Sequence, residues 1–229
     1  MEAIVLAGGL GTRLRHVMPD LPKPMAPVAG RPFLELLLNR LAQKGFRRVV
    51  LSVGYMAEKI VEHFGDRFSG MELVYATEST PLGTGGAVRF ALSFCEMDHV
   101  FVFNGDTYLD LEVAEVETQW QVNHRPVIVA REVTDTARFG SLEIREGRVS
   151  HFLEKGVTGP GLINAGCYVL APDSLDAFPS GQAFSFESDY LVHAVRQDIF
   201  DCFLTCGYFL DIGDPQDYAR AQRDLAVYS

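Results

Sequence analysis

The chain has 229 residues, of which 48% are hydrophobic and 22% are charged, a composition that is ordinary for a soluble globular protein. A chain of this length buries roughly 70% of the surface that its unfolded form exposes, so a core without disulfide or metal staples is expected. Twenty Lys and Arg against 30 Asp and Glu give a net charge of −10, which excludes a general attraction for nucleic acid. A few converging cations and backbone N–H groups can still bind a small anion.

The four cysteines show none of the two-residue gaps that mark zinc knuckles and redox dithiols. The N-terminal residues carry no basic region and too short an apolar stretch for a signal peptide. No uninterrupted apolar segment approaches the roughly 20 residues needed to span a bilayer. We therefore expect a cytoplasmic protein with no membrane partner. The 16 Phe residues could serve the core or an interface, so a homo-oligomer stays open.

Continuous apolar runs in the first half of the chain predict strands of a parallel sheet, because helices cover both faces of such sheets. Helical patterns lie between these runs, and Pro32 and Gly45 suit the start and the end of the first helix. Alternating strands and helices predict an α/β sheet with right-handed crossovers. The strands are expected at residues 2–7, 48–53 and 99–103, and the helices at residues 32–44, 54–64 and 86–94.

Short strands dominate the second half and predict antiparallel pairing. Glu146-Gly147-Arg148 is typical of a hairpin turn. Asp214 as N-cap and Pro215 at the first helical position predict the start of a last helix. The strands are expected at residues 127–131, 141–145, 149–153 and 162–170, and the helices at residues 186–195 and 215–225.

A glycine-rich segment, LAGGLGTRL at residues 6–14, follows the first strand. Glycines directly after a buried strand let the backbone approach a ligand closely, and successive N–H groups form a concave anion site. Arg13 adds a bidentate phosphate donor. The segment is neither a Walker A loop nor a dinucleotide GxGxxG, since Leu14 occupies the last glycine position. A plain strand-to-helix turn is the alternative interpretation.

A second segment, Pro22-Lys23-Pro24-Met25, follows the glycines. The two prolines are expected to hold Lys23 in a stiff, extended conformation. Its side chain then has less entropy to lose when it binds an anion. Such a segment by itself is more often a surface loop.

Together the two segments resemble the signature of the sugar-phosphate nucleotidyltransferases, L/V-x-G-G-x-G-T/S-R-L/M followed by P-K-P-M/L. Five further segments resemble motifs of this family in the same order, namely residues 78–87, 104–106, 152–155, 164–168 and 207–213. The resemblance implies an α/β fold: a Rossmann-like, three-layer, mostly parallel sheet with a small antiparallel substrate lobe and no C-terminal β-helix. It also implies one nucleotidyltransferase domain over residues 1–229, with residues 1–125 mainly binding nucleotide and residues 126–229 mainly binding sugar phosphate.

Members of this family transfer the NMP of a nucleoside triphosphate to a sugar 1-phosphate and release pyrophosphate. The resemblance implies direct in-line displacement, in which catalysis is mostly positioning and charge stabilisation. It assigns catalytic roles to Arg13, Lys23 and Asp106. Asp106 and Asp211 would hold Mg²⁺, which prefers carboxylate and phosphate oxygens. Without the motifs, the two acids would be read as turn carboxylates and the two cations as solvated surface groups.

The same resemblance implies two sets of binding residues. The nucleotide-binding residues are Leu6, Ala7, Gly8, Gly9, Gly11, Thr12, Arg13, Lys23, Glu78, Pro81, Gly83, Thr84, Asn104 and Gly105. The sugar-phosphate-binding residues are Gly140, Glu154, Lys155, Asn164, Ala165 and Gly166. A surface salt bridge to Glu154 is the alternative role for Lys155, and a buried structural amide is the alternative for Asn164.

Glu78 bears on the choice of base. An ionised carboxylate can accept both the N1–H and the N2 amine of guanine, so Glu78 favours GTP as the partner. Some uridylyltransferases of the family also have Glu here, and an N-acetylmuramate 1-phosphate uridylyltransferase stays an alternative. Among compact members, the pattern most resembles the guanylyltransferases of D-glycero-α-D-manno-heptose 1-phosphate, with a mannose 1-phosphate guanylyltransferase as a rival. A catalytically inactive nucleotide-sugar sensor is the alternative outside enzymes.

Overall fold

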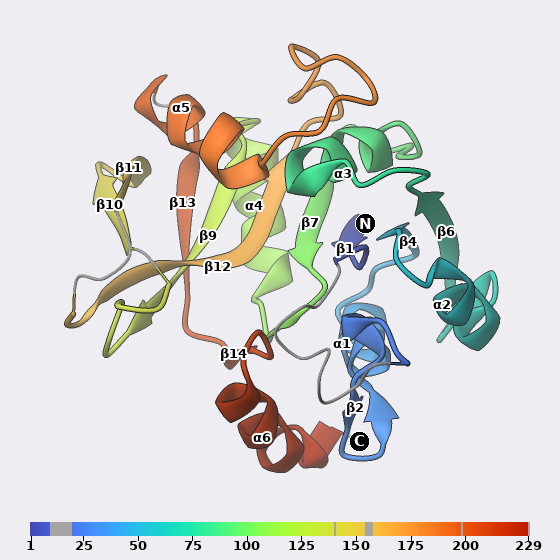
Figure 1. Ribbon diagram of the computed structural model, residues 1–229. Helices are drawn as coiled ribbons and strands as arrows, with labels where there is room; N and C mark the ends of the chain where they lie inside the picture. The colour runs from blue at the N-terminus through green and yellow to red at the C-terminus, as the bar shows by residue number, and fades with distance from the viewer. Residues whose placement is uncertain (10–19, 140, 154–157, 198, 229) are drawn as a thin grey trace.

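The computed structural model describes residues 1–9, 20–139, 141–153, 158–197 and 199–228 (Figure 1). The strands are β1 (Glu2–Leu6), β2 (Pro27–Val28), β3 (Arg31–Pro32), β4 (Arg48–Val53), β5 (Arg67–Phe68), β6 (Met71–Thr77), β7 (Val100–Asn104), β8 (Thr107–Leu109), β9 (Val127–Val133), β10 (Ser141–Arg145), β11 (Arg148–Leu153), β12 (Gly161–Leu170), β13 (Asp201–Thr205) and β14 (Phe209–Asp211). The α-helices are α1 (Phe33–Gln43), α2 (Ala57–Phe64), α3 (Gly83–Leu92), α4 (Val113–Asn123), α5 (Val192–Ala194) and α6 (Pro215–Asp224). The 3-10 and π segments are η1 (Lys23–Met25), η2 (Phe186–Leu191), η3 (Val195–Gln197) and η4 (Ala226–Tyr228).

A ten-stranded sheet in the order β10-β11-β13-β9-β12-β7-β1-β4-β6-β5 forms the centre of the molecule. Strands β7, β1, β4 and β6 are parallel neighbours, as expected for the first half. Strand β12 runs antiparallel to both β7 and β9, and β9 pairs in parallel with β13. The predicted fold class is therefore confirmed, and the antiparallel strands extend the same sheet that carries the parallel ones.

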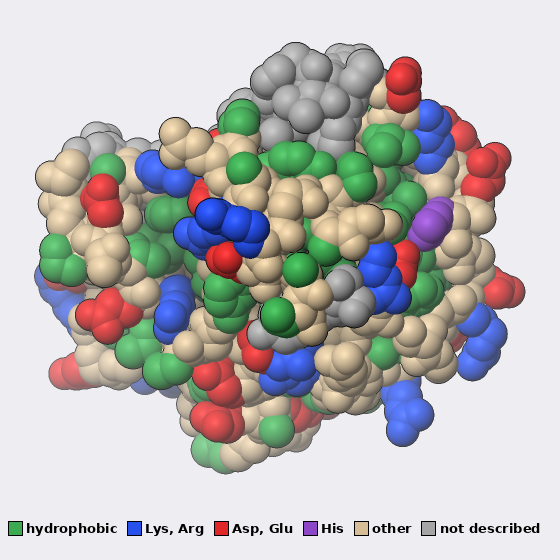
Figure 2. All heavy atoms as spheres, turned by 90° about the horizontal axis from the view of Figure 1, so that it is seen from below, with side chains coloured by type: hydrophobic (Ala, Val, Ile, Leu, Met, Phe, Trp, Pro, Cys, Tyr) green, Lys and Arg blue, Asp and Glu red, His purple; other side chains and the backbone are tan. Residues whose placement is uncertain are grey.

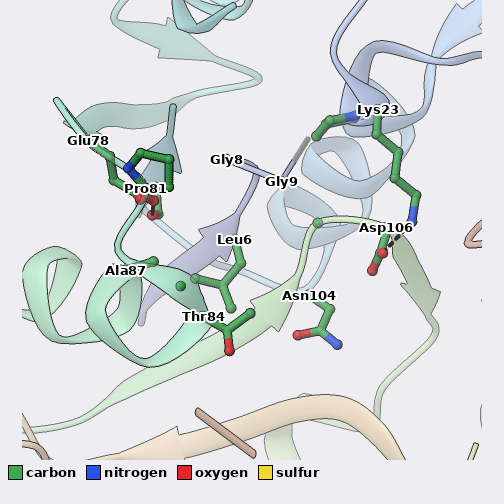
Figure 3. Close-up of a pocket in the computed structure, with 14 residues that line it drawn as sticks. Leu6, Gly8, Gly9, Lys23, Glu78, Pro81, Thr84, Ala87, Asn104 and Asp106 are labelled. Carbon is green, nitrogen blue, oxygen red and sulfur yellow. Dashed lines mark hydrogen bonds and ion pairs between the residues drawn. The ribbon is translucent and has the colours of Figure 1, made fainter. Parts of the chain in front are cut away.

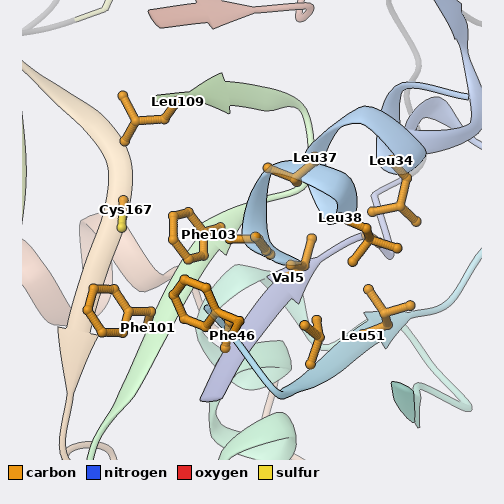
Figure 4. Packing of buried hydrophobic residues seen from close by; sticks show 14 of the residues in the cluster. Val5, Leu34, Leu37, Leu38, Phe46, Leu51, Phe101, Phe103, Leu109 and Cys167 are labelled. Carbon is orange, nitrogen blue, oxygen red and sulfur yellow. The ribbon is translucent and has the colours of Figure 1, made fainter. Parts of the chain in front are cut away.

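Helices cover both faces of this sheet and create two cores (Figure 1). Strand β1 contributes to both cores because its side chains alternate: Ala3 and Val5 face α1, α2 and α4, whereas Ile4 faces α3 and η2. In the first core, the ring of Phe46 meets the rings of Phe101 and Phe103 edge-on, at centroid distances of 5.3 and 5.9 Å (Figure 4). These rings hold the segment before β4 against β7.

A third, smaller apolar cluster joins the C-terminal helix α6 to β2, β14 and the far side of α1. Asp214 caps α6 as predicted, since its side chain accepts the N–H groups of Gln216 and Asp217. The hydroxyl of Tyr218 donates to the carbonyl of Pro27 at 2.6 Å. The last helix is thereby anchored to the first half of the chain, next to the segment that carries Lys23.

Several predicted elements agree closely with the structure. Strand β4 has the predicted bounds, and β10 and β11 pair antiparallel across Glu146 and Gly147, which both have positive φ (+49° and +76°). The helix predicted at 54–64 begins three residues later than expected, at Ala57. The helix predicted at 86–94 begins three residues earlier, at Gly83. No helix within the described ranges is long and apolar enough to cross a membrane.

Among the longer elements, β6, α4 and β13 were not predicted, and the short strands β2, β3, β5, β8 and β14 were not predicted either. Helix α4 buries only Val113, Val116 and Trp120 of its eleven residues, so its apolar pattern is sparse. The expectation of an extended conformation at Lys23 was wrong. Residues Lys23–Met25 form one 3-10 turn, which is closed by the N–H of Met25 donating to the carbonyl of Pro22 at 2.8 Å. The fixed φ of Pro24 is compatible with this turn.

Candidate active site

A cavity of about 310 Å³ opens where β1, β4 and β7 end and α3 begins (Figure 3). Parallel strands present their carboxyl ends at one edge of a sheet, and ligands of open α/β sheets bind there. The residues that line this cavity are Leu6, Gly8, Gly9, Lys23, Pro24, Ser52, Glu78, Pro81, Gly83, Thr84, Ala87, Asn104, Gly105 and Asp106. We call it the first cavity.

The first cavity has two chemically different ends (Figure 3). Glu78 and Pro81 lie at one end, and Lys23 and Asp106 lie at the other, with the backbone of Gly8–Gly9 between them. This separation of the Glu78 end from the Lys23 end suits an elongated ligand with a flat polar group at one end and anionic groups at the other.

Gly105 shows how closely the backbone segments approach in this cavity. Its N–H donates to the carbonyl of Leu6 at 3.0 Å, and a Cβ at this position would lie 2.4 Å from the same oxygen. Any side chain would therefore separate the ends of β1 and β7. The sequence needs glycine here because these two strand ends form the floor of the cavity.

Glu78 is half-buried and oriented by the protein. Its Oε2 accepts the N–H of Leu82 at 2.9 Å, and its Oε1 accepts a longer hydrogen bond from the hydroxyl of Ser52 at 3.4 Å. Burial raises the pKa of the Glu78 carboxyl, and the two hydrogen bonds oppose that rise. Each carboxylate oxygen has a further lone pair, so Glu78 can still accept from a ligand.

Lys23 and Asp106 form an ion pair at the other end of the first cavity. Nζ of Lys23 lies 2.5 Å from Oδ2 of Asp106, with side-chain exposures of 12% and 36%. The 3-10 turn η1 presents the lysine, and the loop after β7 presents the acid. A shielded ammonium beside a carboxylate is suited to hold a phosphate on one side and a metal ion on the other.

Asp211 lies next to this ion pair although it comes from the other half of the chain. Strands β8 and β14 pair antiparallel and place Asp211 opposite Thr107, and the N–H of Ile212 donates to the carbonyl of Asp106 at 2.9 Å. Burial and the charge of Asp106 raise the pKa of the Asp211 carboxyl, while Lys23 opposes the rise. The fold therefore brings together the two acids that the sequence analysis paired.

The donor set at Asp106 and Asp211 fits a hard divalent cation. Two adjacent carboxylates with one raised pKa form a site whose repulsion a cation would relieve. Within the described residues, no group of three or more His, Cys, Asp or Glu side chains is arranged to hold a metal ion. Magnesium needs only one or two carboxylates, because phosphate and water supply its other ligands.

A second cavity of about 300 Å³ adjoins the first and shares Asn104 with it. The residues that line it are Asn104, Thr107, Arg138, Phe139, Asn164, Ala165, Gly166, Glu187, Phe209, Asp211, Gly213 and Asp214. Most of these come from the second half of the chain. Because Asp211 lines this cavity and Asp106 lines the first, the candidate metal position lies where the two cavities meet.

Asn164 and Gly166 form a bulge of β12 in the second cavity. The Oδ1 of Asn164 accepts the N–H of Gly166 at 3.1 Å, and its Nδ2 donates to the hydroxyl of Tyr168 at 2.6 Å. Gly166 has φ +71°, and a Cβ there would lie 2.6 Å from Nδ2 of Asn104. The amide of Asn164 thus has a structural role, which was the alternative to sugar binding, because it holds the bulge together. It also lines the second cavity.

The structure brings most of the predicted binding residues to these two cavities. Ala7 is an exception, because its side chain is fully buried in the core and does not line either cavity. Thr84 lines the first cavity, but its hydroxyl accepts the N–H of Phe186 at 2.9 Å, which joins α3 to η2. The predicted residues Gly11, Thr12, Arg13, Gly140, Glu154 and Lys155 lie outside the described residues.

Several cavity residues were missed by the sequence analysis. In the first cavity they are Pro24, Ser52 and Ala87. In the second cavity they are Thr107, Arg138, Phe139, Glu187, Phe209, Gly213 and Asp214. A polar residue at a strand end signals Ser52. Glu187 lies in the predicted helix at 186–195 and Arg138 lies near the predicted residue Gly140, but no signal in the sequence marked either side chain itself. The face seen from below shows basic and acidic side chains intermixed (Figure 2). An anionic ligand would therefore be attracted by local groups in the cavities and not by a broad positive electrostatic field on this face.

Comparison with known proteins agrees with this geometry. The nucleotidyl transferase family matches residues 2–227. The chain is 38% identical, over the full length of both chains, to D-glycero-alpha-D-manno-heptose 1-phosphate guanylyltransferase from Aneurinibacillus thermoaerophilus. It is 39% identical to the protein of the same name from Campylobacter jejuni, over 95% of this chain and 97% of the relative.

A solved structure shows the same similarity. HddC from Yersinia pseudotuberculosis superposes with a TM-score of 0.88 and 37% identity, covering 98% of this chain and 99% of that one. Its complex with GMP-PN gives a TM-score of 0.86 with the same identity and coverage. The match along nearly the whole chain, together with the paired cavities, shows that the chain belongs to the nucleotidyl transferase family.

Proposed function

We propose that this protein transfers GMP from GTP to D-glycero-α-D-manno-heptose 1-phosphate, giving GDP-heptose and pyrophosphate. The observation that carries the proposal is the pair of adjoining cavities that meet at Asn104, with Asp106 and Asp211 at their junction. Two substrates that must meet at one phosphorus atom need such an arrangement. Full-length similarity to two heptose 1-phosphate guanylyltransferases supports this choice of substrates.

The nucleotide is assigned to the first cavity. Glu78 would accept hydrogen bonds from the guanine edge, and the backbone of Gly8–Gly9 would lie along the phosphates. Lys23 would stabilise the charge that develops on the phosphoryl oxygens. Arg13, Gly11 and Thr12 are proposed to complete the phosphate site, as the resemblance implies.

The sugar 1-phosphate is assigned to the second cavity. Its phosphate would lie toward Asp211, and its ring would lie against Ala165 and Gly166. Gly140, Glu154 and Lys155 are proposed as further contacts. In this arrangement a sugar-phosphate oxygen faces the α-phosphorus, and no covalent nucleophile from the protein is required. We therefore divide one domain into a nucleotide half, residues 1–125, and a sugar-phosphate half, residues 126–229.

Magnesium is the proposed cofactor, with Asp106 and Asp211 as its protein ligands. When bound, the ion would neutralise charge on the phosphate oxygens. The protein contributes the preorganisation: the β8–β14 pair fixes the separation of the two acids, and the N–H of Gly213 orients Asp211 by donating to its Oδ1 at 2.6 Å.

Pyrophosphate release tests the proposal directly. GTP, UTP, CTP, ATP and dTTP would each be combined with heptose, mannose, glucose and N-acetylmuramic acid 1-phosphates in the presence of Mg²⁺. We expect the highest kcat/KM for GTP with the manno-heptose. Turnover of UTP in place of GTP would contradict the role of Glu78, and a folded protein that releases no pyrophosphate in any combination would support a sensor.

A further inference from the structure

Arg138 occupies a turn that is held rigidly to the rest of the protein. The turn follows β9, and the N–H of Phe139 donates to the carbonyl of Thr136 at 3.0 Å. The Asp135 carboxylate accepts the N–H groups of Ala137 and Gly159 at 3.1 and 3.2 Å. The backbone that carries Arg138 is therefore fixed by hydrogen bonds on both sides.

The guanidinium of Arg138 is oriented by two acids and a ring. Its Nη2 donates to Asp214 and, at 2.7 Å, to Oδ2 of Asp217. Its Cζ lies 5.5 Å from the centroid of the Phe139 ring. Asp214 cannot readily swing away, because its other oxygen caps α6. The plane of the guanidinium is thus set before any ligand arrives.

This oriented group keeps free hydrogen-bond donors on the wall of the second cavity. The Arg138 side chain is 51% exposed and lines that cavity together with Asp211 and Asn164. Within the described part of the chain, its hydrogen bonds all leave from Nη2. The Nε and Nη1 donors are consequently available, in the fixed fork geometry of a guanidinium.

The surrounding charge favours a neutral acceptor for these donors. Asp214 and Asp217 together outweigh the single positive charge of Arg138, and Arg220, which lies 3.6 Å from Asp217, is shared with Asp224 at 3.4 Å. This corner therefore carries no excess of positive charge, and with Glu187 and Asp211 in the same cavity it offers little attraction to a phosphate dianion. A sugar hydroxyl, which accepts a hydrogen bond without bringing charge, suits it better.

We propose that Arg138 binds hydroxyl oxygens of the sugar through Nε and Nη1 and so helps to select the sugar 1-phosphate. The inference rests on the proposed function, because it takes the second cavity as the sugar site. A cavity group that donates to a substrate hydroxyl discriminates strongly against analogues that lack the hydroxyl. Arg138 would therefore be a specificity-determining residue of the sugar half.

The test uses the full-length protein with Arg138→Gln and Arg138→Lys. Arg138→Lys keeps a positive charge beside Asp214 and Asp217 but removes the forked N–H donors of the guanidinium. It therefore distinguishes the loss of hydrogen bonds to the sugar from a loss of folding. We expect both variants to raise the KM for the sugar 1-phosphate about tenfold, which corresponds to about 1.4 kcal/mol. The KM for GTP should stay unchanged. Arg220→Gln is the matched control, because it removes another cation that contacts Asp217 but does not line the cavity.

Binding measurements separate the sugar from its phosphate. By calorimetry, the variants should bind the GDP-sugar about tenfold more weakly than the wild type, while GDP binds equally to both. Equal weakening for GDP and the GDP-sugar would overturn the inference in favour of a phosphate contact. Unchanged affinity for the GDP-sugar in a folded variant would also overturn it. A wild type that turns over none of the sugar 1-phosphates would instead contradict the proposed function.

Discussion

Replacing Asp211 by Asn is expected to stabilise the protein while it abolishes turnover. In the folded chain, burial and the nearby charge of Asp106 raise the pKa of Asp211, so its ionised form is disfavoured. Asparagine removes the charge and keeps an oxygen that can accept the N–H of Gly213, now 2.6 Å from Oδ1. The substitution therefore relieves repulsion without leaving a buried donor unpaired.

The magnitude follows from this arrangement. Each unit of raised pKa corresponds to about 1.4 kcal/mol of disfavoured ionisation, and Lys23 compensates part of it. We expect Asp211→Asn to raise the free energy of unfolding by about 1 kcal/mol at pH 7, a gain of about 2–4 °C in Tm for a domain of this size. The wild type carries this penalty above the folded pKa of Asp211. The gain should therefore vanish as the pH falls below about 4, where the unfolded carboxyl is also protonated.

Thermal unfolding in EDTA at several pH values measures the effect, and pyrophosphate release measures turnover. Mg²⁺ should raise the Tm of the wild type, since it binds the folded chain, but not that of the variant. Asp110→Asn is the matched control, because Asp110 directly follows β8, the strand that pairs with β14. Burial raises the pKa of Asp110, but hydrogen bonds from Arg40 and Lys44 lower it on balance, so this variant should lose stability at pH 7. An Asp211→Asn protein that is less stable than the wild type at pH 7 would refute the reasoning.

Three further substitutions test other parts of the structure. Glu78→Gln should lower kcat/KM for GTP about tenfold or more, because a charged hydrogen bond is worth about 1.5–3 kcal/mol. Pyrophosphate release with each of the five nucleotides measures this effect. An unchanged preference for GTP would contradict the role of Glu78. Asp106→Asn should cut turnover at least a hundredfold while calorimetry still detects GTP, since the base contacts remain; loss of GTP binding would contradict this. In Gly85→Ala the new Cβ would lie 2.2 Å from the Phe184 ring, so we expect the free energy of unfolding, measured in urea, to fall by about 2 kcal/mol. An unchanged urea midpoint would show that the ring can move.

The nucleotide side of the fold was largely predictable from the sequence. Strands β1, β4 and β7 are buried on both faces, so their continuous apolar runs reveal them, and glycine or polar residues mark their ends. Since parallel strands end at one edge, placing Leu6, Ser52 and Asn104 near one another needs only the right strand order. Local conformation was less predictable. The 3-10 turn at Lys23 depends on a backbone hydrogen bond from the N–H of Met25 to the carbonyl of Pro22, and the fixed φ angles of the two prolines do not by themselves determine it.

The two acids of the proposed metal site could be paired by resemblance, but no local pattern in the sequence predicts their contact. Strands β8 and β14 have three residues each, too few for a periodic signal. Their register, with Asp211 opposite Thr107, is fixed by tertiary contacts such as the packing of Tyr108 and Leu210 in the cluster around α6. A sequence pattern reports burial along one element, whereas this site depends on the alignment of two elements about a hundred residues apart.

The sugar side of the proposed site depends in the same way on contacts between distant segments. Arg138 lies two residues before the predicted binding residue Gly140, but nothing in the sequence marks the arginine itself, and an isolated arginine in a loop is usually solvated. The role proposed for it rests on the structure, in which Asp214 and Asp217, at the start of α6, orient it beside the second cavity. In the proposed arrangement, nucleotide binding relies on backbone groups at the ends of regular strands, and such groups leave a signature in the sequence. The proposed selection of the sugar relies on side chains from turns and short strands, whose alignment depends on tertiary contacts and leaves no such signature.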